Sequence, residues 1–345
     1  MENPKVSICC LAYNSEKFIK ETVASFVNQS FKDIEILISD DCSTDNTVKI
    51  IKENFNDDRI KLFEQKINLG PSDNTNYILK IATGDYIALC ASDDVMHEQR
   101  IKKSIEFLEN NPEFDMVYTF VKIIDEKSKI ISSDLSNLFN KKIASNNILK
   151  HFFYSGNFIC APSVLIKRSV FENILFNPCL IQGQDFDFWI RMLLNDMNIG
   201  CLEEELTFYR IHGNNLSLPS DLSKKNEMNS SWAFEWSKIL ENYSKLINDK
   251  QKFEKIFGFD LIDEKLIKFA IAKEALTVKS RSHYLFALNI IYNEFLDKNI
   301  KELILEKYFF GLEDYKKLCK NFNNIDLFIK RKPLHKKLLK KIFNF

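Results

Sequence analysis

Several motifs of common enzyme classes are missing from this chain, and each absence excludes a function. There are only 8 glycines in 345 residues, and none of them forms a GxGxxG or a Walker A loop. A nicotinamide enzyme and a P-loop NTPase are therefore disfavoured. The 8 cysteines include no CxxC pair, and most lie inside apolar runs. We expect buried, reduced thiols of a cytosolic protein, and neither a disulfide framework nor a zinc site.

The chain also lacks long apolar runs and an excess of either charge. No run of about 18 apolar residues occurs, so a membrane-spanning helix is not expected. Strand-like sequence begins within residues 1–12 without a basic segment before it, so a signal peptide is not expected either. Lys+Arg and Asp+Glu both total 48, which gives no argument for a nucleic-acid partner. The length suggests about two domains.

The first 125 residues alternate short apolar runs with longer amphipathic stretches. Strands are predicted at Val6–Leu11, Ile34–Ser39, Ile60–Phe63, Tyr86–Leu89 and Met116–Ile123. Helices are predicted at 15–27, 44–53, 71–81 and 97–109. Such alternation indicates an α/β fold, with a mostly parallel, Rossmann-like sheet covered on both faces.

The rest of the chain divides into three parts. Residues 125–147 are rich in Ser, Asn and Lys without a clear period, and are predicted to be a mobile connection. A second half, 147–219, completes a first domain of residues 1–219, with helices predicted at 147–154 and 184–194 and strands at 163–166 and 206–211. Residues 220–345 show a helical pattern and form a separate C-terminal region.

Polar side chains follow three of the predicted strands. They are Ala12-Tyr13-Asn14, Asp40-Asp41 and Asp93-Asp94. Ligands of open α/β sheets bind beyond the carboxyl ends of the strands. A carboxylate at such a position is also a common helix cap, so each Asp has that alternative reading. Together they predict a nucleotide diphosphate site, with Mg²⁺ or Mn²⁺ between the phosphates and Asp93 or Asp94. Asp40 could accept the imide N–H of uracil or thymine, and Tyr13 could lie against the base.

A family resemblance rests on several motifs in one order. The stretches Val6–Asn14 and Ile38–Asp45, then Asn68-Leu69-Gly70, Thr83-Gly84-Asp85-Tyr86 and Ser92-Asp93-Asp94, resemble family 2 glycosyltransferases with the GT-A fold. The resemblance covers roughly residues 4–217. It implies a nucleotide-sugar donor, a divalent metal and inversion at the anomeric carbon. It also implies a nucleotide-binding group of Ala12, Tyr13, Asn14, Asp40, Asp41 and Asp93.

Two later segments resemble further motifs of the family. Gln184-Asp185-Phe186-Asp187-Phe188-Trp189 is similar to its Glu-Asp-x-x-Trp segment, which implies that Asp185 is the catalytic base and that Gln184 and Trp189 lie on the acceptor side. Tyr209-Arg210-Ile211-His212 resembles a segment near the diphosphate, which implies metal ligation by His212 together with Asp93 and Asp94. The alternatives are a helix N-terminus stabilised by Asp185 and a structural His212.

The sequence departs from the family at two positions. Ala91 stands where the metal motif usually has its first Asp, and Gln184 replaces the usual Glu. Both substitutions favour one alternative, a non-catalytic nucleotide-sugar-binding or scaffold protein, whereas Asp93, Asp94 and Asp185 oppose it. A sugar nucleotidyltransferase is a second alternative, but its glycine-rich basic loop after the first strand is absent at 12–17.

The C-terminal tail, residues 330–345, reads KRKPLHKKLLKKIFNF. Apolar residues recur at helical spacing and lysines occupy the other side, which is typical of a helix at an anionic membrane surface. A final helix docked on the protein is the alternative. The composition is rich in Lys, Asn, Ile and Phe, which suggests an AT-rich bacterial genome. Together with the resemblance, it suggests an enzyme that assembles surface polysaccharide, lipooligosaccharide or protein glycan. We expect a cytoplasmic location, with peripheral contact at the inner membrane and a glycan or lipid-linked acceptor.

Overall fold

The computed structural model describes residues 4–213, 215 and 222–321. Its described residues form two compact units. The sheet unit contains residues up to Asn146 and resumes at Asn157, and the helical unit contains Asn147–Gly156 and the residues after position 220.

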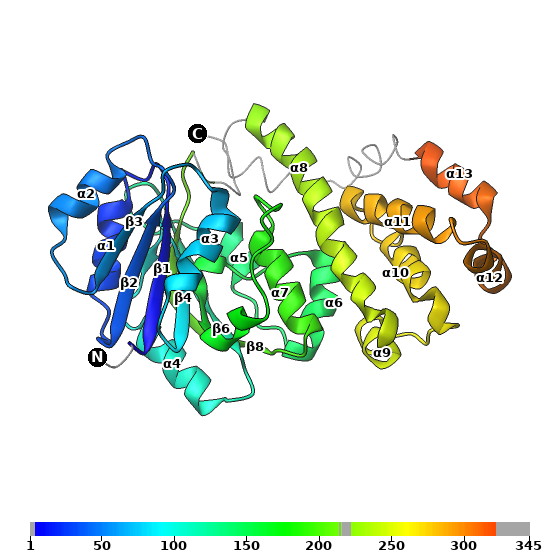
Figure 1. Cartoon of the computed structure of the whole chain (residues 1–345), viewed down its shortest axis with the longest axis horizontal. Coiled ribbons are helices and arrows are strands. Elements are labelled where there is room, and N and C mark those ends of the chain that lie inside the picture. Colours follow the sequence, from blue (N-terminus) through cyan, green and yellow to red (C-terminus); the bar gives the residue numbers. More distant parts are fainter. Residues whose placement is uncertain (1–3, 214, 216–221, 322–345) are drawn as a thin grey trace. The chain divides into compact units, whose positions relative to one another are not determined.

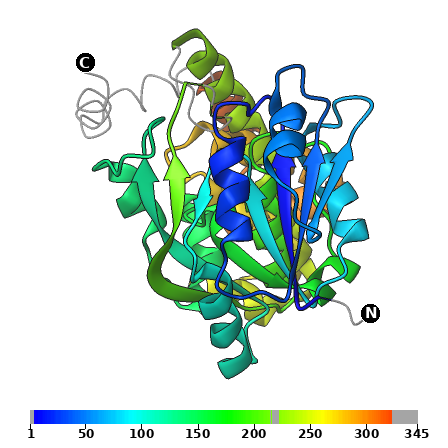
Figure 2. The ribbon, with the colours of Figure 1, turned by 90° about the vertical axis from the view of Figure 1, so that its left-hand side faces the viewer.

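The sheet unit contains one eight-stranded sheet in the order β3-β2-β1-β4-β7-β6-β8-β5 (Figures 1 and 2). The strands are β1 (Val6–Ala12), β2 (Ile34–Asp40), β3 (Ile60–Glu64), β4 (Tyr86–Ala91), β5 (Val95–Met96), β6 (Met116–Ile124), β7 (Val164–Lys167) and β8 (Ile199–Arg210). Neighbours among β3, β2, β1 and β4 are parallel, as are β6 and β8, whereas β7 runs antiparallel to both its neighbours. The predicted α/β class with a mostly parallel sheet is confirmed.

Helices connect these strands and bury their apolar faces against the sheet. They are α1 (Ile19–Val27), α2 (Thr47–Asn54), α3 (Gly70–Ile81), α4 (Arg100–Asn110), α5 (Asp134–Phe139) and α7 (Gln184–Leu194), with single 3₁₀ turns at 161–163 and 168–172. Strand β2 is buried at every position and β1 at all but one, as expected for strands covered on both faces. Ile19, Val23 and Phe26 of α1 join β1 and β2 in one hydrophobic core.

The register of the parallel strands brings the predicted site residues to one edge of the sheet. Ala12 at the end of β1 pairs with Asp40 at the end of β2. On the other side of β1, Leu11 pairs with Ala91 at the end of β4. The loops that carry Asn14, Asp40 and the Asp93-Asp94 pair therefore leave the sheet at the same edge.

Gly84 allows the chain to pass close to β1 before β4 begins. A Cβ at this position would lie 2.5 Å from the backbone nitrogen of Ser7. The Gly84 N–H donates to Ser7 Oγ at 2.9 Å, and Ser7 Oγ–H donates to the buried Glu35 at 2.6 Å. The Thr83-Gly84 motif thus serves strand packing here.

Strand β8 begins at Ile199, seven positions before the predicted start at 206. The acidic run Glu203-Glu204-Glu205 concealed it, because three adjacent carboxylates disfavour a strand unless cations neutralise them. Each of them has a lysine partner contributed by another part of the chain: Lys142, Lys103 and Lys122 respectively. Such partners are not visible in the local pattern.

The predicted mobile connection at 125–147 is wrong, because this segment is folded and docked. It contains α5, which Ser133 caps by accepting the Leu135 N–H. Asn140 accepts the N–H of Val121 at 2.7 Å and donates to its carbonyl at 3.0 Å, so one side chain imitates a strand partner of β6. The polar composition reflects these side-chain bonds to the backbone, which local periodicity does not reveal.

The helical unit confirms the predicted helical C-terminal region over the described residues. Its helices are α8 (Leu222–Leu240), α9 (Lys250–Phe257), α10 (Ile267–Ala275), α11 (Arg281–Glu294), α12 (Lys298–Tyr308) and α13 (Leu312–Asn321), and most of α6 (Ser145–Ser155) belongs to it. Within the described ranges, no helix combines the length and apolarity required to cross a bilayer. The tail at 330–345 lies outside the described residues.

Helix α6 differs from the expected organisation, which assigned 147–154 to the first domain. Its Phe153 contacts the rings of Tyr243, Phe257 and His283, with centroids 4.9 to 5.4 Å apart. Burial lowers the pKa of His283 to about 4, so this imidazole is neutral at physiological pH. Aromatic packing with residues far along the chain therefore places the segment in the helical unit.

Candidate active site

The loop after β1 is tied to the loop after β2 by Asn14. Its Oδ1 accepts the Thr44 N–H at 2.8 Å, and its own N–H donates to Ser43 Oγ at 2.9 Å. Next to it, Tyr13 is 50% exposed, so part of its side chain is accessible to a ligand, whereas Ala12 is buried.

The neighbouring carboxylates Asp40 and Asp41 have different partners. Asp40 accepts the N–H of Ser43 at 2.9 Å and its hydroxyl at 2.5 Å, which closes a turn at the end of β2. Asp41 accepts the N–H groups of Leu69 and Gly70 at 2.7 and 2.9 Å. Burial raises the pKa of Asp41, while these two bonds oppose the rise. Asp41 thus holds the start of α3, the cap reading that the sequence left open.

Asp93 and His212 form a close pair at the end of the sheet. Asp93 Oδ2 lies 2.8 Å from His212 Nε2, and their side chains are 23% and 10% exposed. The ring of Phe18 lies 4.8 Å from the imidazole, and the His212 N–H donates to Asn215 Oδ1. The fold thus brings together two residues that are 119 positions apart, one with a carboxylate oxygen and one with an imidazole nitrogen.

Asp94 faces the interior, unlike Asp93. Its Oδ1 accepts the backbone N–H of Arg210 at 2.8 Å, and its buried Oδ2 has no hydrogen-bond donor among the described residues. Together with Arg100 it lines a small pocket of about 10 Å³. Burial raises the pKa of Asp94 well above its usual range, and the adjacent Asp93 raises it further. Asp94 thus joins the turn after β4 to the end of β8, and metal ligation by Asp94 stays a prediction.

The Arg210 side chain forms the centre of this region, a role that the sequence analysis did not assign. It is fully buried and donates to the carbonyls of Asp93 and Asp125 at 2.7 and 3.0 Å. It also donates to Ser128 Oγ at 2.9 Å and pairs with Glu21 at 2.7 Å. All three nitrogens of the guanidinium donate hydrogen bonds, and through them Arg210 positions Asp93 and the 125–129 turn.

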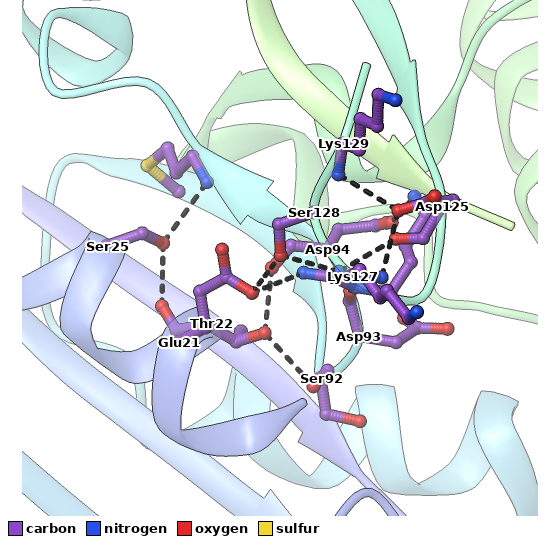
Figure 3. A network of polar contacts seen from close by, with 12 residues as sticks. Glu21, Thr22, Ser25, Ser92, Asp93, Asp94, Asp125, Lys127, Ser128 and Lys129 are labelled. Atoms are coloured by element: carbon purple, nitrogen blue, oxygen red, sulfur yellow. Dashed lines mark hydrogen bonds and ion pairs between the residues drawn. The ribbon is translucent and has the colours of Figure 1, made fainter. Parts of the chain in front are cut away.

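Helix α1 fixes the turn that carries the acidic pair. The Thr22 hydroxyl donates to the carbonyls of Ser92 and Asp94 at 3.1 and 2.8 Å (Figure 3). Ser25 accepts the Met96 N–H at 3.1 Å while donating to the Thr22 carbonyl. Thr22 and Ser25 lie one turn apart, on the face of α1 toward the turn that follows β4. Two hydroxyl residues at this spacing are a signal that could have been found from the sequence.

Asp185 stands in the first turn of α7, in a less polar setting. Its Oδ1 accepts the Phe186 N–H at 2.7 Å and its Oδ2 accepts the Asn157 side-chain amide at 3.0 Å. Burial raises the pKa of Asp185 to about 6, although these hydrogen bonds oppose the rise. A carboxyl with this pKa is ionised at neutral pH and can accept a proton.

Tyr209 and Cys160 relate the two acidic sites. Burial raises the pKa of the Tyr209 phenol, and the charges of Asp94, Asp93 and Asp185 all raise it further. The same three carboxylates raise the pKa of the Cys160 thiol, after burial. Both side chains are thus influenced by Asp93 and by Asp185, and both carboxylates belong to the sheet unit.

Two predicted acceptor-side residues occupy unexpected positions. Trp189 is fully buried, with its ring 5.5 Å from that of Phe188 in edge-to-face contact. The Trp189 side chain therefore packs in the core, and its acceptor-side role stays a prediction. The Gln184 Oε1 is buried and accepts no hydrogen bond from the described residues. A further carboxylate of α7, Asp187, is paired with Arg191 at 2.6 Å and stabilises the helix.

The comparisons with known proteins agree with this arrangement. Residues 7–175 match the profile "Glycosyl transferase family 2". The chain is 32% identical over 212 residues, 61% of its length and 79% of the relative's, to the Escherichia coli protein named UDP-Glc:alpha-D-GlcNAc-diphosphoundecaprenol beta-1,3-glucosyltransferase WfaP. The chain belongs to glycosyltransferase family 2. It is accordingly a glycosyltransferase.

Solved structures show the fold of this glycosyltransferase independently. The S. aureus TarS fragment 1–349 in complex with UDP-GlcNAc superposes with a TM-score of 0.57 at 19% identity, covering 93% of this chain and 92% of that one. The Pyrobaculum calidifontis mannosyltransferase PcManGT with GDP-Man and Mn²⁺ gives 0.53 at 13% identity, covering 94% and 86%. These likenesses show the GT-A fold.

Enzymes of this family typically use a divalent metal, and the donor set of this glycosyltransferase fits one. Asp93 Oδ2 and His212 Nε2 are a carboxylate oxygen and an imidazole nitrogen that face each other at 2.8 Å. Both atom types bind Mn²⁺, and the carboxylate oxygen also binds Mg²⁺. The described residues contain no cluster of three or more His, Cys, Asp or Glu side chains around one point. Two protein ligands suit a cation whose other ligands are phosphates and water.

Proposed function

We propose that this glycosyltransferase moves a sugar from a nucleotide-diphosphate donor, with a UDP-sugar favoured, to a hydroxyl of a glycan or lipid-linked acceptor, with inversion at the anomeric carbon. The products belong to bacterial surface polysaccharide, lipooligosaccharide or protein-glycan assembly. The observation that carries the proposal is the pairing of Asp93 with His212 near a separate, buried carboxyl at Asp185.

Asp185 is proposed as the catalytic base. It takes the proton of the acceptor hydroxyl while that oxygen attacks the anomeric carbon and the bond to the diphosphate breaks. One displacement inverts the configuration at that carbon. A pKa of about 6 keeps the base ionised at neutral pH while leaving it basic enough to accept the proton.

Asp93 and His212 are proposed to hold Mg²⁺ or Mn²⁺, and an ion held there would supply positive charge to balance the leaving diphosphate. The Mn²⁺ in the PcManGT complex supports this choice. Arg210 donates to the carbonyl of Asp93, and Asp94 accepts the N–H of Arg210, two residues before His212. In this proposal the shortened motif with Ala91 is compensated by His212.

The nucleotide is proposed to lie over the ends of β1 and β2. The exposed Tyr13 side chain is offered to the base, with Ala12, Asn14 and Asp40 completing the proposed nucleotide site. Asp40, an acceptor when ionised, favours the imide of uracil. Two relatives support a UDP-sugar: the name of WfaP includes UDP-Glc, and TarS was solved with UDP-GlcNAc.

The acceptor is proposed from the name of a relative, and the location from the sequence of the C-terminal tail. WfaP is named for a diphosphoundecaprenol-linked acceptor, which is a lipid carrier. The basic, apolar sequence at 330–345 is suited to anionic lipid. We place the enzyme at the cytoplasmic face of the inner membrane, in peripheral contact through that tail.

A donor screen tests the proposal. The protein is incubated with Mn²⁺, GlcNAc-diphosphoundecaprenol and UDP-, GDP- or dTDP-sugars, and the released nucleoside diphosphate is measured. We expect UDP release that needs the metal and is lost in Asp185→Asn. Absence of nucleotide binding would favour the scaffold alternative, and pyrophosphate release from UTP and a sugar 1-phosphate would favour a nucleotidyltransferase.

A further inference from the structure

Asn157 has two polar contacts that determine how its side chain is oriented. Its Oδ1 accepts the Ile159 N–H at 3.0 Å, and its Nδ2 donates to Asp185 Oδ2 at 3.0 Å. The oxygen must face the Ile159 N–H, because an amide nitrogen cannot accept that bond. The NH₂ group is therefore directed at the carboxylate, and the opposite orientation would place two oxygens together at Asp185.

The backbone that carries Asn157 is anchored on its C-terminal side. Phe158, Ile159 and Cys160 are all buried, and the Phe158 ring meets that of Tyr118 edge to face at 5.8 Å. The carbonyl of Cys160 accepts the hydroxyl and the N–H of Ser163. An amide on such a buried segment has little freedom to follow a moving partner.

We propose that Asn157 is the positioning residue for Asp185. Its amide donates to one carboxylate oxygen, holds the carboxylate in one rotamer and stabilises its ionised form. Each oxygen of Asp185 then accepts one protein N–H, from Asn157 or Phe186, and retains a lone pair for the acceptor hydroxyl. The inference deepens the proposed function, since the orientation matters for transfer only if Asp185 is the base.

Few other titratable groups face this carboxylate. Cys160 and Tyr209 lie within electrostatic range, and burial raises both their pKa values, so both stay neutral where Asp185 titrates. On α7 itself, Asp187 is paired with Arg191. The Asn157 amide is the one side-chain donor to Asp185 recorded in the described part of the chain. A change at this amide should therefore have a direct effect on the titration of Asp185.

The experiment follows the Asp185 carboxyl by ¹³C NMR in protein labelled with [4-¹³C]aspartate, and the resonance missing from Asp185→Asn assigns it. In Asn157→Asp the oxygen that accepts the Ile159 N–H is retained and only the donor is replaced, by a like charge. We expect the Asp185 midpoint to rise by about 1 pH unit or more. The added carboxyl is recognised as a resonance that the wild type lacks.

Asn140→Asp is the matched control. Asn140 also uses its oxygen for one backbone N–H and its NH₂ for a carbonyl, both of Val121. The same substitution there should lower stability without moving the Asp185 midpoint. If Asn157→Asp does not fold, Asn157→Ala removes the donor without adding charge and should raise the midpoint by a smaller amount.

An unchanged Asp185 midpoint in folded Asn157→Asp or Asn157→Ala would overturn the inference, as would an equal shift in Asn140→Asp. This readout needs no substrate. Should the midpoint shift while Asp185→Asn still transfers sugar, the role of Asp185 as base would fall and the contact of Asn157 with it would stand.

Discussion

The two acidic sites use the same residue type in opposite surroundings. Around Asp93, the chain provides a dense polar network, in which Arg210 alone reaches Glu21, Asp125 and Ser128. Around Asp185 the surroundings are largely apolar and two N–H donors suffice. One carboxylate is positioned by charge and hydrogen bonds, whereas the other is tuned by burial.

This difference matches two different tasks. A metal ligand must stay ionised and fixed in position, and the Arg210 network holds the Asp93 backbone firmly. A base must exchange a proton near neutral pH, and burial raises the pKa of Asp185 to about 6. Substitutions at the Asp93 site should therefore change metal binding, whereas substitutions at Asp185 should change the rate of transfer.

The largest expected effect is on catalysis in Asp185→Asn. Removing the base should lower kcat by about 1,000-fold, with UDP affinity unchanged, because the nucleotide contacts lie elsewhere. Asp187→Asn on the same helix is the control, since it breaks the pair with Arg191 and should cost stability while transfer continues. A fully active Asp185→Asn enzyme would show that Asp185 is not the base, and the two acidic sites could then not be assigned these two tasks.

Arg210→Met should have the largest effect on stability. It leaves the Asp93 and Asp125 carbonyls without their donor inside the protein, at a cost of about 3 kcal/mol in the free energy of unfolding. Urea denaturation measures this. Glu21→Gln is the matched variant, and because Glu21 is 45% exposed its loss of charge should cost less than about 1 kcal/mol. Equal losses would contradict the central role of Arg210.

His212→Ala should act on the metal. Removing one of two protein ligands should weaken Mn²⁺ binding by about 10-fold or more, as measured by electron paramagnetic resonance of free Mn²⁺ in the presence of UDP. Asn215→Ala removes the Oδ1 that accepts the His212 N–H but keeps the imidazole, so it should weaken binding less. Lost activity in His212→Ala with unchanged metal affinity would assign His212 another role.

The smallest effect is the pH dependence of the wild type. Transfer requires ionised Asp185, so kcat/KM should decline as pH falls through about 6. Below that midpoint the decline should approach 10-fold per pH unit, because only the ionised fraction accepts a proton. A rate that stays constant down to pH 5 would show that burial does not tune this carboxyl.

The sheet could be predicted from sequence because its strands carry their signal locally. Val6–Leu11 and Ile34–Ser39 are apolar runs buried on both faces, and the motifs after them fall at the strand ends. The roles of Asp40 and Asp41 could not be separated in the same way. Both follow β2, and only the tertiary path of the 65–70 loop makes Asp41 a cap.

Other features depend on partners far away in the chain. The burial of Asp94 and Trp189 is set by neighbours that no local pattern contains. Arg210 reaches residues 82 to 189 positions away, so its network is invisible to any window of sequence. The direction of the side chains at the candidate site required the fold.

Calorimetric titration with UDP, with and without Mn²⁺, tests the central claim most directly. The wild type should bind UDP tightly only with Mn²⁺, and Asp93→Asn should lose most of that metal-dependent gain while keeping the weaker metal-free binding. Equal UDP affinity with and without Mn²⁺, or an Asp93→Asn variant that behaves as the wild type does, would contradict the account of Asp93 and His212 as the metal end of a donor site.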